Sequence, residues 1–120
     1  MSGILGTSSR KSGIIGRSQD TAKAWVNFNG TGTLAIRDSF NVSSVTDNGT
    51  GDYSTNFRTN MQNDKYVVVS GCGNNAASTS FANRFEAYSR AVGTFRALNY
   101  AYNASAAYDR EVCYHIVFGD

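Results

Sequence analysis

Few side chains in this sequence could do chemistry, and its single histidine is the first to consider. His115 stands at an alternating position of the run REVCYHIVF (110–118), a pattern typical of a strand. A catalytic or metal-binding histidine needs partners, and the sequence offers no second histidine and no cysteine spacing typical of zinc. We therefore expect His115 to be a strand histidine whose hydrogen bonds are satisfied inside the protein.

The two cysteines, Cys72 and Cys113, lie in strand-like runs and form no CxxC motif. The N-terminal segment lacks the uninterrupted apolar stretch of a signal peptide, so we expect the chain to be made in a reducing compartment. Buried thiols are therefore expected in preference to a disulfide or a redox pair.

The stretch DNGTGD (47–52) is the best candidate for a metal site, because Asp47, Asn48 and Asp52 could offer oxygens to Ca²⁺. Its spacing lacks the glutamate that ends an EF-hand loop, whereas Asn-Gly is typical of tight hairpin turns. We expect a turn. Since the sequence also lacks a GxSxG elbow, a phosphate loop and a dinucleotide fingerprint, it predicts no enzyme, no metal and no cofactor.

Tyrosines among asparagine and serine residues in the C-terminal part form a second kind of candidate site. Exposed rings of this kind can stack on sugars or be buried in an oligomer interface, and the sequence leaves both alternatives open. The residues concerned are Tyr88, Tyr100, Tyr102 and Tyr108.

The elements that must position these residues are predicted to be strands, because the hydrophobic pattern from Ala24 onward has a period of two. Tyr53, Thr55 and Phe57, for example, share one face of their run. About seven or eight short strands separated by turn residues predict an all-β domain, an antiparallel sandwich or barrel, over residues 24–120. The expected strands occupy residues 24–29, 33–40, both arms of a hairpin in 40–57, 65–73, 84–92, 94–102 and 110–118.

Residues 1–23 differ from this domain and are expected to form an extended arm. Ser-Gly-Ile-Leu-Gly (2–6) recurs as Ser-Gly-Ile-Ile-Gly (12–16), and the segment carries a net charge of +3 against −1 for residues 24–120. Two apolar dipeptides bury too little surface to fold alone, so we expect the arm to dock on a partner. The anchoring residues would be Ile4, Leu5, Arg10, Lys11, Ile14, Ile15 and Arg17.

The expected partner of this arm is an acidic protein surface. Three net charges give little affinity for phosphates at physiological salt, so a nucleic-acid partner is not expected. No segment has the apolar length of a membrane span. Only 17% of the residues are charged, and open sheet edges on such a chain favour association into an oligomer.

The stretch from Trp25 to about Tyr66, especially WVNFNGTGT and RDSFNVSSVTDNGTGDY, resembles a module of virion proteins of tailed bacteriophages, in particular marine ones. RKSGIIG in the arm also resembles short segments of such proteins. The resemblance implies a non-enzymatic structural or adhesive β-domain, commonly trimeric, of tail fibres or other surface appendages.

The chain departs from a typical fibre protein because it is short and has no coiled-coil or repetitive shaft. We therefore expect a homotrimeric virion protein, made in the host cytoplasm without a signal peptide, that decorates the capsid. Its arm, residues 1–23, would bind the major capsid protein or another virion protein. The alternative is a tail-fibre or tail-associated adhesin that binds a host glycan or receptor.

Overall fold

The computed structural model describes residues 21–73, 83–101 and 107–119, and every regular element in these ranges is a strand. The expectation of an all-β domain is therefore confirmed. Among the described residues no helix is long and apolar enough to cross a membrane. The strands are β1 (Ala22–Asn29), β2 (Ala35–Phe40), β3 (Val42–Gly49), β4 (Asp52–Phe57), β5 (Val67–Gly73), β6 (Asn83–Tyr88), β7 (Thr94–Ala101) and β8 (Val112–Phe118).

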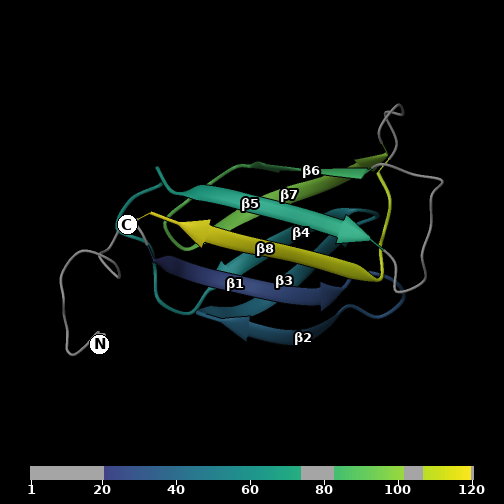
Figure 1. Ribbon diagram of the computed structural model, residues 1–120, viewed down its shortest axis with the longest axis horizontal. Coiled ribbons are helices and arrows are strands. Elements are labelled where there is room, and N and C mark those ends of the chain that lie inside the picture. The colour runs from purple at the N-terminus through teal and green to yellow at the C-terminus, as the bar shows by residue number, and fades with distance from the viewer. Residues whose placement is uncertain (1–20, 74–82, 102–106, 120) are drawn as a thin grey trace, which may run out of the picture.

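The strands form two four-stranded sheets that pack face to face as a sandwich (Figure 1). The first sheet has the order β2-β1-β8-β5 and the second the order β3-β4-β7-β6, with every pair antiparallel. Three pairs, β1–β2, β3–β4 and β6–β7, join strands that follow one another in the chain. The central pairs β1–β8 and β4–β7 join distant segments, so each sheet is completed only by long-range pairing.

Alternation along each strand decides which residues reach the space between the sheets. In β4 the side chains of Tyr53, Thr55 and Phe57 are buried, as the sequence predicted, and the residues between them are half-buried. Val26 and Phe28 of β1 are buried in the same way. The hydrophobic period of two was therefore a correct guide to the inner face of both sheets.

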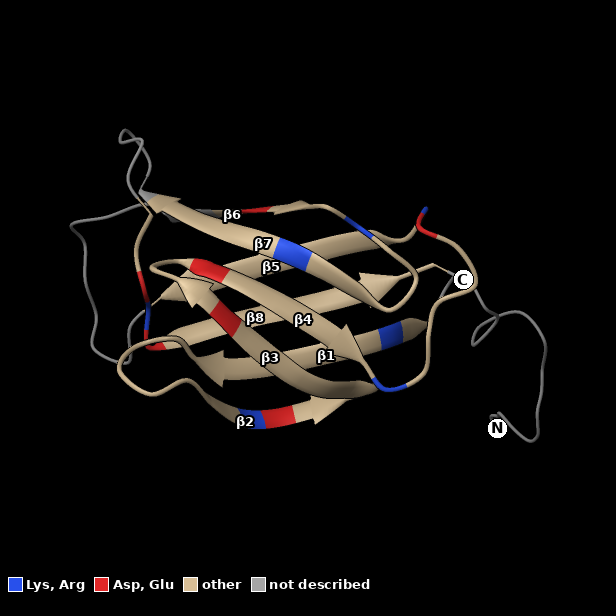
Figure 2. Ribbon diagram, turned by 180° about the vertical axis from the view of Figure 1, so that it is seen from behind, with Lys and Arg blue, Asp and Glu red and all other residues tan. Residues whose placement is uncertain are grey.

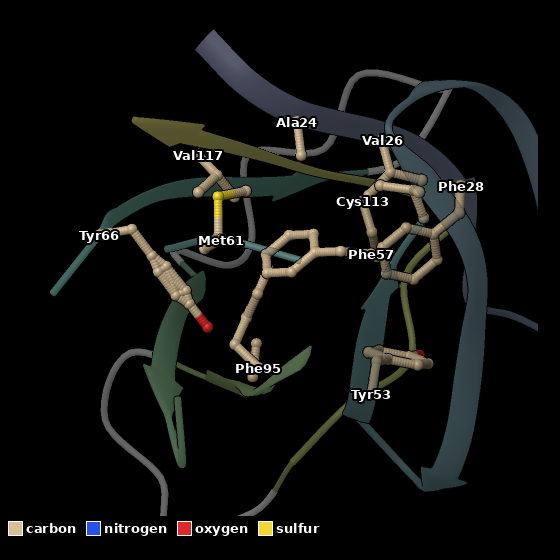
Figure 3. Close-up of a cluster of buried hydrophobic side chains, with 12 residues drawn as sticks. Ala24, Val26, Phe28, Tyr53, Phe57, Met61, Tyr66, Phe95, Cys113 and Val117 are labelled. Atoms are coloured by element: carbon tan, nitrogen blue, oxygen red, sulfur yellow. The ribbon is translucent and has the colours of Figure 1, made fainter. Parts of the chain in front are cut away.

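Aromatic rings fill most of this core (Figure 3). Phe57 contacts Tyr66 and Phe95 with ring centroids 5.6 Å and 5.9 Å apart, and Phe28 meets the edge of Tyr53 at 5.0 Å. Tilted and edge-on pairs at such distances add to the free energy gained from burying the rings. The core thus joins residues of both sheets into one cluster.

The chain crosses from the first sheet to the second at Asn41, the only residue between β2 and β3. Asn41 has a φ of 54°, in the left-handed region that asparagine tolerates better than most residues. Its side-chain amide donates to the carbonyl oxygens of Lys23 (3.0 Å) and Thr59 (3.1 Å), and its Oδ1 accepts from the Thr59 N–H (2.7 Å). Asn41 therefore fixes the corner between the sheets.

A buried polar cluster closes one end of the sandwich. The Tyr53 hydroxyl donates to Asp109 Oδ1 at 2.6 Å and lies 3.2 Å from the carbonyl oxygen of Gly30. The same Asp109 oxygen accepts from the Gly51 N–H at 2.8 Å. Burial and the neighbouring carboxylate raise the pKa of Tyr53, so the phenol keeps its proton and donates it.

Strand β1 begins at Ala22, two residues before the domain boundary expected at Ala24. Ala22 pairs with Phe118 and Ala24 with Val117, with the bulge between them at Lys23. Residues 22 and 23, which fall within the expected arm, therefore lie in the first strand.

Candidate interaction surface

The outer face of the first sheet carries a row of apolar side chains that crosses all four strands. Trp25 of β1 pairs with Phe40 of β2 on one side and with Ile116 of β8 on the other, and Ile116 pairs with Val69 of β5. Directly opposed residues of antiparallel strands share a face, and Val26, the neighbour of Trp25, points inward. We call Phe40, Trp25, Ile116 and Val69 the apolar row.

The apolar row is largely open to solvent. Phe40 and Val69 are each 52% exposed and Trp25 is 36% exposed, although all three are large hydrophobic residues. An antiparallel sheet with one solvated face normally presents polar residues there. The first sheet departs from this rule along the apolar row, although Asn27 and the exposed Asp38 lie on the same face, so the row is a candidate contact surface.

Tyr114 and Val67 widen the row into what we call the apolar face. Tyr114 of β8 is exposed and lies opposite Gly71 of β5, where a Cβ atom would collide with the phenol ring. The glycine therefore leaves room for the ring to lie across β5. Strands β5 and β8 contain no charged residue, and Figure 2 shows both without a charged position. Nothing charged interrupts this half of the apolar face.

The outer face of the second sheet, called the polar face, has the opposite character. Arg96 of β7 donates to both carboxylate oxygens of Asp52 in β4, through Nε at 2.8 Å and Nη2 at 2.6 Å. These bonds hold the pKa of Asp52 below its usual value. The Tyr88 ring lies 5.7 Å from the guanidinium carbon, and Asn56 donates to Ser44 Oγ at 3.0 Å. These polar groups satisfy one another on the surface.

The candidate tyrosines lie in different elements. Tyr88 in β6 and Tyr100 in β7 alternate with inward residues, so both belong to the polar face. Tyr108 lies between β7 and β8, where its N–H donates to the Asn99 carbonyl at 3.0 Å. Tyr102 lies outside the described residues. Sequence reasoning left out Tyr114, although its alternation with buried Cys113 and His115 was a usable signal.

The anchoring residues of the arm all lie outside the described residues: Ile4, Leu5, Arg10, Lys11, Ile14, Ile15 and Arg17. The described chain begins at Thr21, beside a groove of about 620 Å³. Phe40 belongs both to this groove and to the apolar row, and Lys23 and Arg58 add positive charge to the lining. The groove thus adjoins the apolar face at the point where the arm joins the domain.

His115 is buried between phenylalanine rings and is neutral at physiological pH. Its Nδ1 lies 2.6 Å from Ser70 Oγ, and burial lowers its pKa to about 3. The expected burial in a strand is confirmed. The expectation that both ring nitrogens form hydrogen bonds is confirmed for Nδ1 alone. Nε2 has no hydrogen-bond partner among the described residues. At 1% exposure the imidazole offers no surface to a substrate.

The stretch DNGTGD forms the turn between β3 and β4, as expected. Asp47 Oδ1 accepts from the Gly49 N–H at 3.0 Å, Asn48 donates to Ser54 Oγ at 2.8 Å, and Asp52 binds Arg96. These oxygens and amides therefore hold the hairpin. In the part of the chain that the structure describes, no three metal-ligating side chains gather.

Both cysteines are free thiols, Cys113 buried and Cys72 half-buried. Burial raises the pKa of Cys113 to about 12 and raises that of Cys72 as well. The expectation of buried thiols is confirmed for Cys113 and only in part for Cys72. Their direct opposition across β5 and β8 was not foreseen, because it depends on strand pairing.

Comparisons of the chain with protein-family models, with curated proteins and with solved structures found no match.

Proposed function

We propose that the chain is a structural virion protein of a tailed phage, a trimeric decoration protein of the capsid that assembles through its apolar face. The observation that carries this proposal is the apolar row, Phe40, Trp25, Ile116 and Val69, on a face that no other described segment covers. Binding and not catalysis is the role proposed for the domain.

The apolar face supports association because contiguous exposed apolar surface typically marks a protein contact. Phe40 and Val69 are half exposed, so covering each would contribute about 1 kcal/mol, roughly half the value of a fully buried side chain. Trp25 and Tyr114 are residue types enriched at interfaces, since both combine a large apolar ring with a hydrogen-bonding group.

The proposed setting is supported by the resemblance of residues 25–66 to virion surface modules. This stretch includes β2, β3, β4 and most of β1, and so supplies two strands to each sheet. It also contains Trp25 and Phe40, half of the apolar row. The proposed trimer would thus use residues within the resembling stretch.

The arm is proposed to attach the trimer to the particle. Residues 1–21 carry two aliphatic pairs and, with Arg10, Lys11 and Arg17 against Asp20, a net charge of +2, suited to apolar pockets flanked by acidic groups. The described chain begins beside the groove lined by Lys23 and Arg58, next to the apolar face. Three arms from one trimer would bind together far more tightly than one arm alone.

An adhesin of the tail is the second candidate, supported by the polar face. Tyr88 lies beside the Arg96–Asp52 pair, and a tyrosine next to paired charged groups offers both a stacking surface and hydrogen bonds to a sugar. Binding of the full chain to a glycan array would favour this role. The number of copies per particle also separates the two roles, because a decoration protein covers the whole capsid whereas a tail component is present in far fewer copies.

Sedimentation of the full chain tests the proposed assembly. We expect the wild type to sediment as a trimer at micromolar concentration. Val69→Glu should weaken association at least about 100-fold, because each contact would bury an uncompensated carboxylate. Val92→Glu is the matched control, since Val92 is 41% exposed but lies in the connection between β6 and β7.

If the wild type sediments as a monomer at these concentrations, the proposed trimer is refuted. If both variants associate as tightly as the wild type, the contacts lie elsewhere and the apolar face does not carry assembly. Circular dichroism and the urea midpoint of each variant show that any loss of association is not a loss of fold.

A further inference from the structure

Cys72 and Cys113 are partners across two neighbouring strands. Cys72 of β5 pairs directly with Cys113 of β8, in an unbroken register that runs from Val67 with Phe118 to Gly73 with Val112. Directly opposed residues of an antiparallel pair project to the same face. Here that face is the inner one, because Cys113 is buried and the Cys72 thiol reaches Asn99 of the second sheet.

The spacing of such a pair suits a disulfide. Opposed residues of antiparallel strands have Cα atoms about 4.5 or 5.5 Å apart, according to their place in the hydrogen-bond ladder. Disulfides join residues with Cα atoms about 4.4–6.8 Å apart, so both classes of pair fall in the range. The backbone of β5 and β8 therefore does not need to separate or slide.

The present contacts of the two thiols are weak and can be exchanged. Cys72 Sγ lies 3.2 Å from Asn99 Oδ1, and Cys113 Sγ lies 3.5 Å from the Arg110 carbonyl oxygen. Thiols are weak donors, so rotating both side chains toward each other loses little. Asn99 keeps its side-chain bond to the Tyr108 carbonyl oxygen at 2.7 Å.

We propose that Cys72 and Cys113 form an oxidisable pair, which a small disulfide converts into a cross-strand disulfide that latches the edge strand β5 to β8. This proposal is independent of the proposed virion role. It names a modification site inside the sandwich, away from the apolar face.

The reaction is thiol–disulfide exchange in two steps. The Cys72 thiolate attacks a small disulfide, forms a mixed disulfide, and releases one thiolate of the reagent. The Cys113 thiolate then attacks the Cys72 sulfur, the second thiolate of the reagent leaves, and both leaving groups take up the protons lost by the cysteines. The two cysteines are oxidised by two electrons in total, and the reagent is reduced to two thiols.

The accessibility of the two thiols determines which of them reacts first, and their burial determines how fast they react. Cys72 is half-buried whereas Cys113 is fully buried, so the reagent meets Cys72 first. Because burial raises the pKa of both thiols, little thiolate is present at neutral pH. Oxidation is therefore slow at neutral pH and faster in alkaline buffer.

The disulfide would close a loop of about 40 residues that contains β6 and β7. Residues 72 and 113 lie where the chain leaves the first sheet after β5 and where it returns to that sheet at β8. Strand β5 is an edge strand and pairs with β8 alone in the first sheet. The disulfide would therefore tie the edge strand β5, which carries Val69, covalently to β8.

Oxidation of the full chain tests the proposal. Reduced protein is incubated with oxidised glutathione at about pH 8.5 and analysed by intact mass, peptide mapping and thermal unfolding. We expect loss of two hydrogens, a peptide joining residues 72 and 113, and a Tm higher by about 10 °C. Cys113→Ala should stop at a single glutathione adduct on Cys72, and Cys72→Ser should gain neither a bond nor stability.

Three results would refute the proposal that Cys72 and Cys113 form an oxidisable pair. These are two free thiols after prolonged oxidation, stable adducts on both cysteines, or disulfide-linked dimers in place of the internal bond. A bond that forms without raising the Tm would refute the latch. Sedimentation of the reduced chain tests assembly separately. The absence of the disulfide would therefore not count against the proposed trimer.

Discussion

Acidification should destabilise this protein through one residue, His115. Its ring is 1% exposed and contacts Phe28, Phe85 and Phe95 at centroid distances of 5.6, 4.8 and 5.3 Å. Nε2 has no hydrogen-bond partner among the described residues, and burial lowers the pKa to about 3 from an ordinary value of 6.5. The folded protein therefore resists a protonation that the unfolded chain accepts easily.

The size of the effect follows from linkage between proton binding and folding. Because the folded-state pKa is depressed, the stabilisation is complete above pH 6.5 and is lost as the pH falls from 6.5 toward 3. Within this window the free energy of unfolding decreases by about 1.4 kcal/mol for each pH unit. By pH 4 the loss reaches about 3 kcal/mol, a large part of the stability of a small domain.

Urea unfolding between pH 7.5 and pH 4 measures this loss. His115 is the only histidine of the chain, so the slope between pH 6.5 and about pH 4.5 has a single side-chain source. The matched control is His115→Phe, which keeps an aromatic ring but cannot bind a proton. Its absolute stability can differ from that of the wild type, but its stability should not change with pH in this window.

Two results would refute the reasoning. A wild-type stability that stays constant from pH 7 to pH 4.5 would mean that the buried ring accepts a proton at little cost. A slope that persists in His115→Phe would place the titrating group elsewhere. Titration of the imidazole by NMR gives an independent check, since a pKa near 6 would contradict the burial on which the argument depends.

Two further predictions concern buried and corner hydrogen bonds. Tyr53→Phe removes the hydroxyl that bonds to Asp109 at 2.6 Å and should lower the free energy of unfolding by about 2 kcal/mol, measured in urea with an unchanged m-value. Asn41→Ala should cost about 2 kcal/mol or more, since it loses three hydrogen bonds and holds alanine at a φ of 54°. Asn41→Gly loses the same bonds but tolerates the backbone, so an equal cost for the two variants would contradict the role given to φ.

The strands and their inner faces could be predicted from the sequence because they depend on local alternation. Val26 and Phe28 in β1, and the run from Tyr53 to Phe57 in β4, needed no knowledge of distant partners. The turn between β3 and β4 was equally local, because Gly49 and Gly51 take the positive φ angles of 135° and 67° that its backbone requires.

The candidate surfaces could not be predicted in the same way, because they depend on which strands pair and in what register. Trp25 becomes part of the apolar row only because β8 places Ile116 beside it and β5 then adds Val69. Arg96 reaches Asp52 for the same kind of reason, because β7 pairs with β4. These pairings join residues far apart in the chain, and no local pattern encodes them.

The central position of β8 sets an order of events during synthesis. Val112–Phe118 is the last strand of the domain to be translated, yet it separates β1 from β5 in the first sheet. Before it emerges from the ribosome, Trp25 and Val69 belong to strands that share no hydrogen bond. Ile116 then joins them, and the apolar row becomes continuous only once β8 has paired with both strands. A nascent chain that lacks β8 therefore cannot present the complete row, so the assembly proposed above would begin only after β8 has paired.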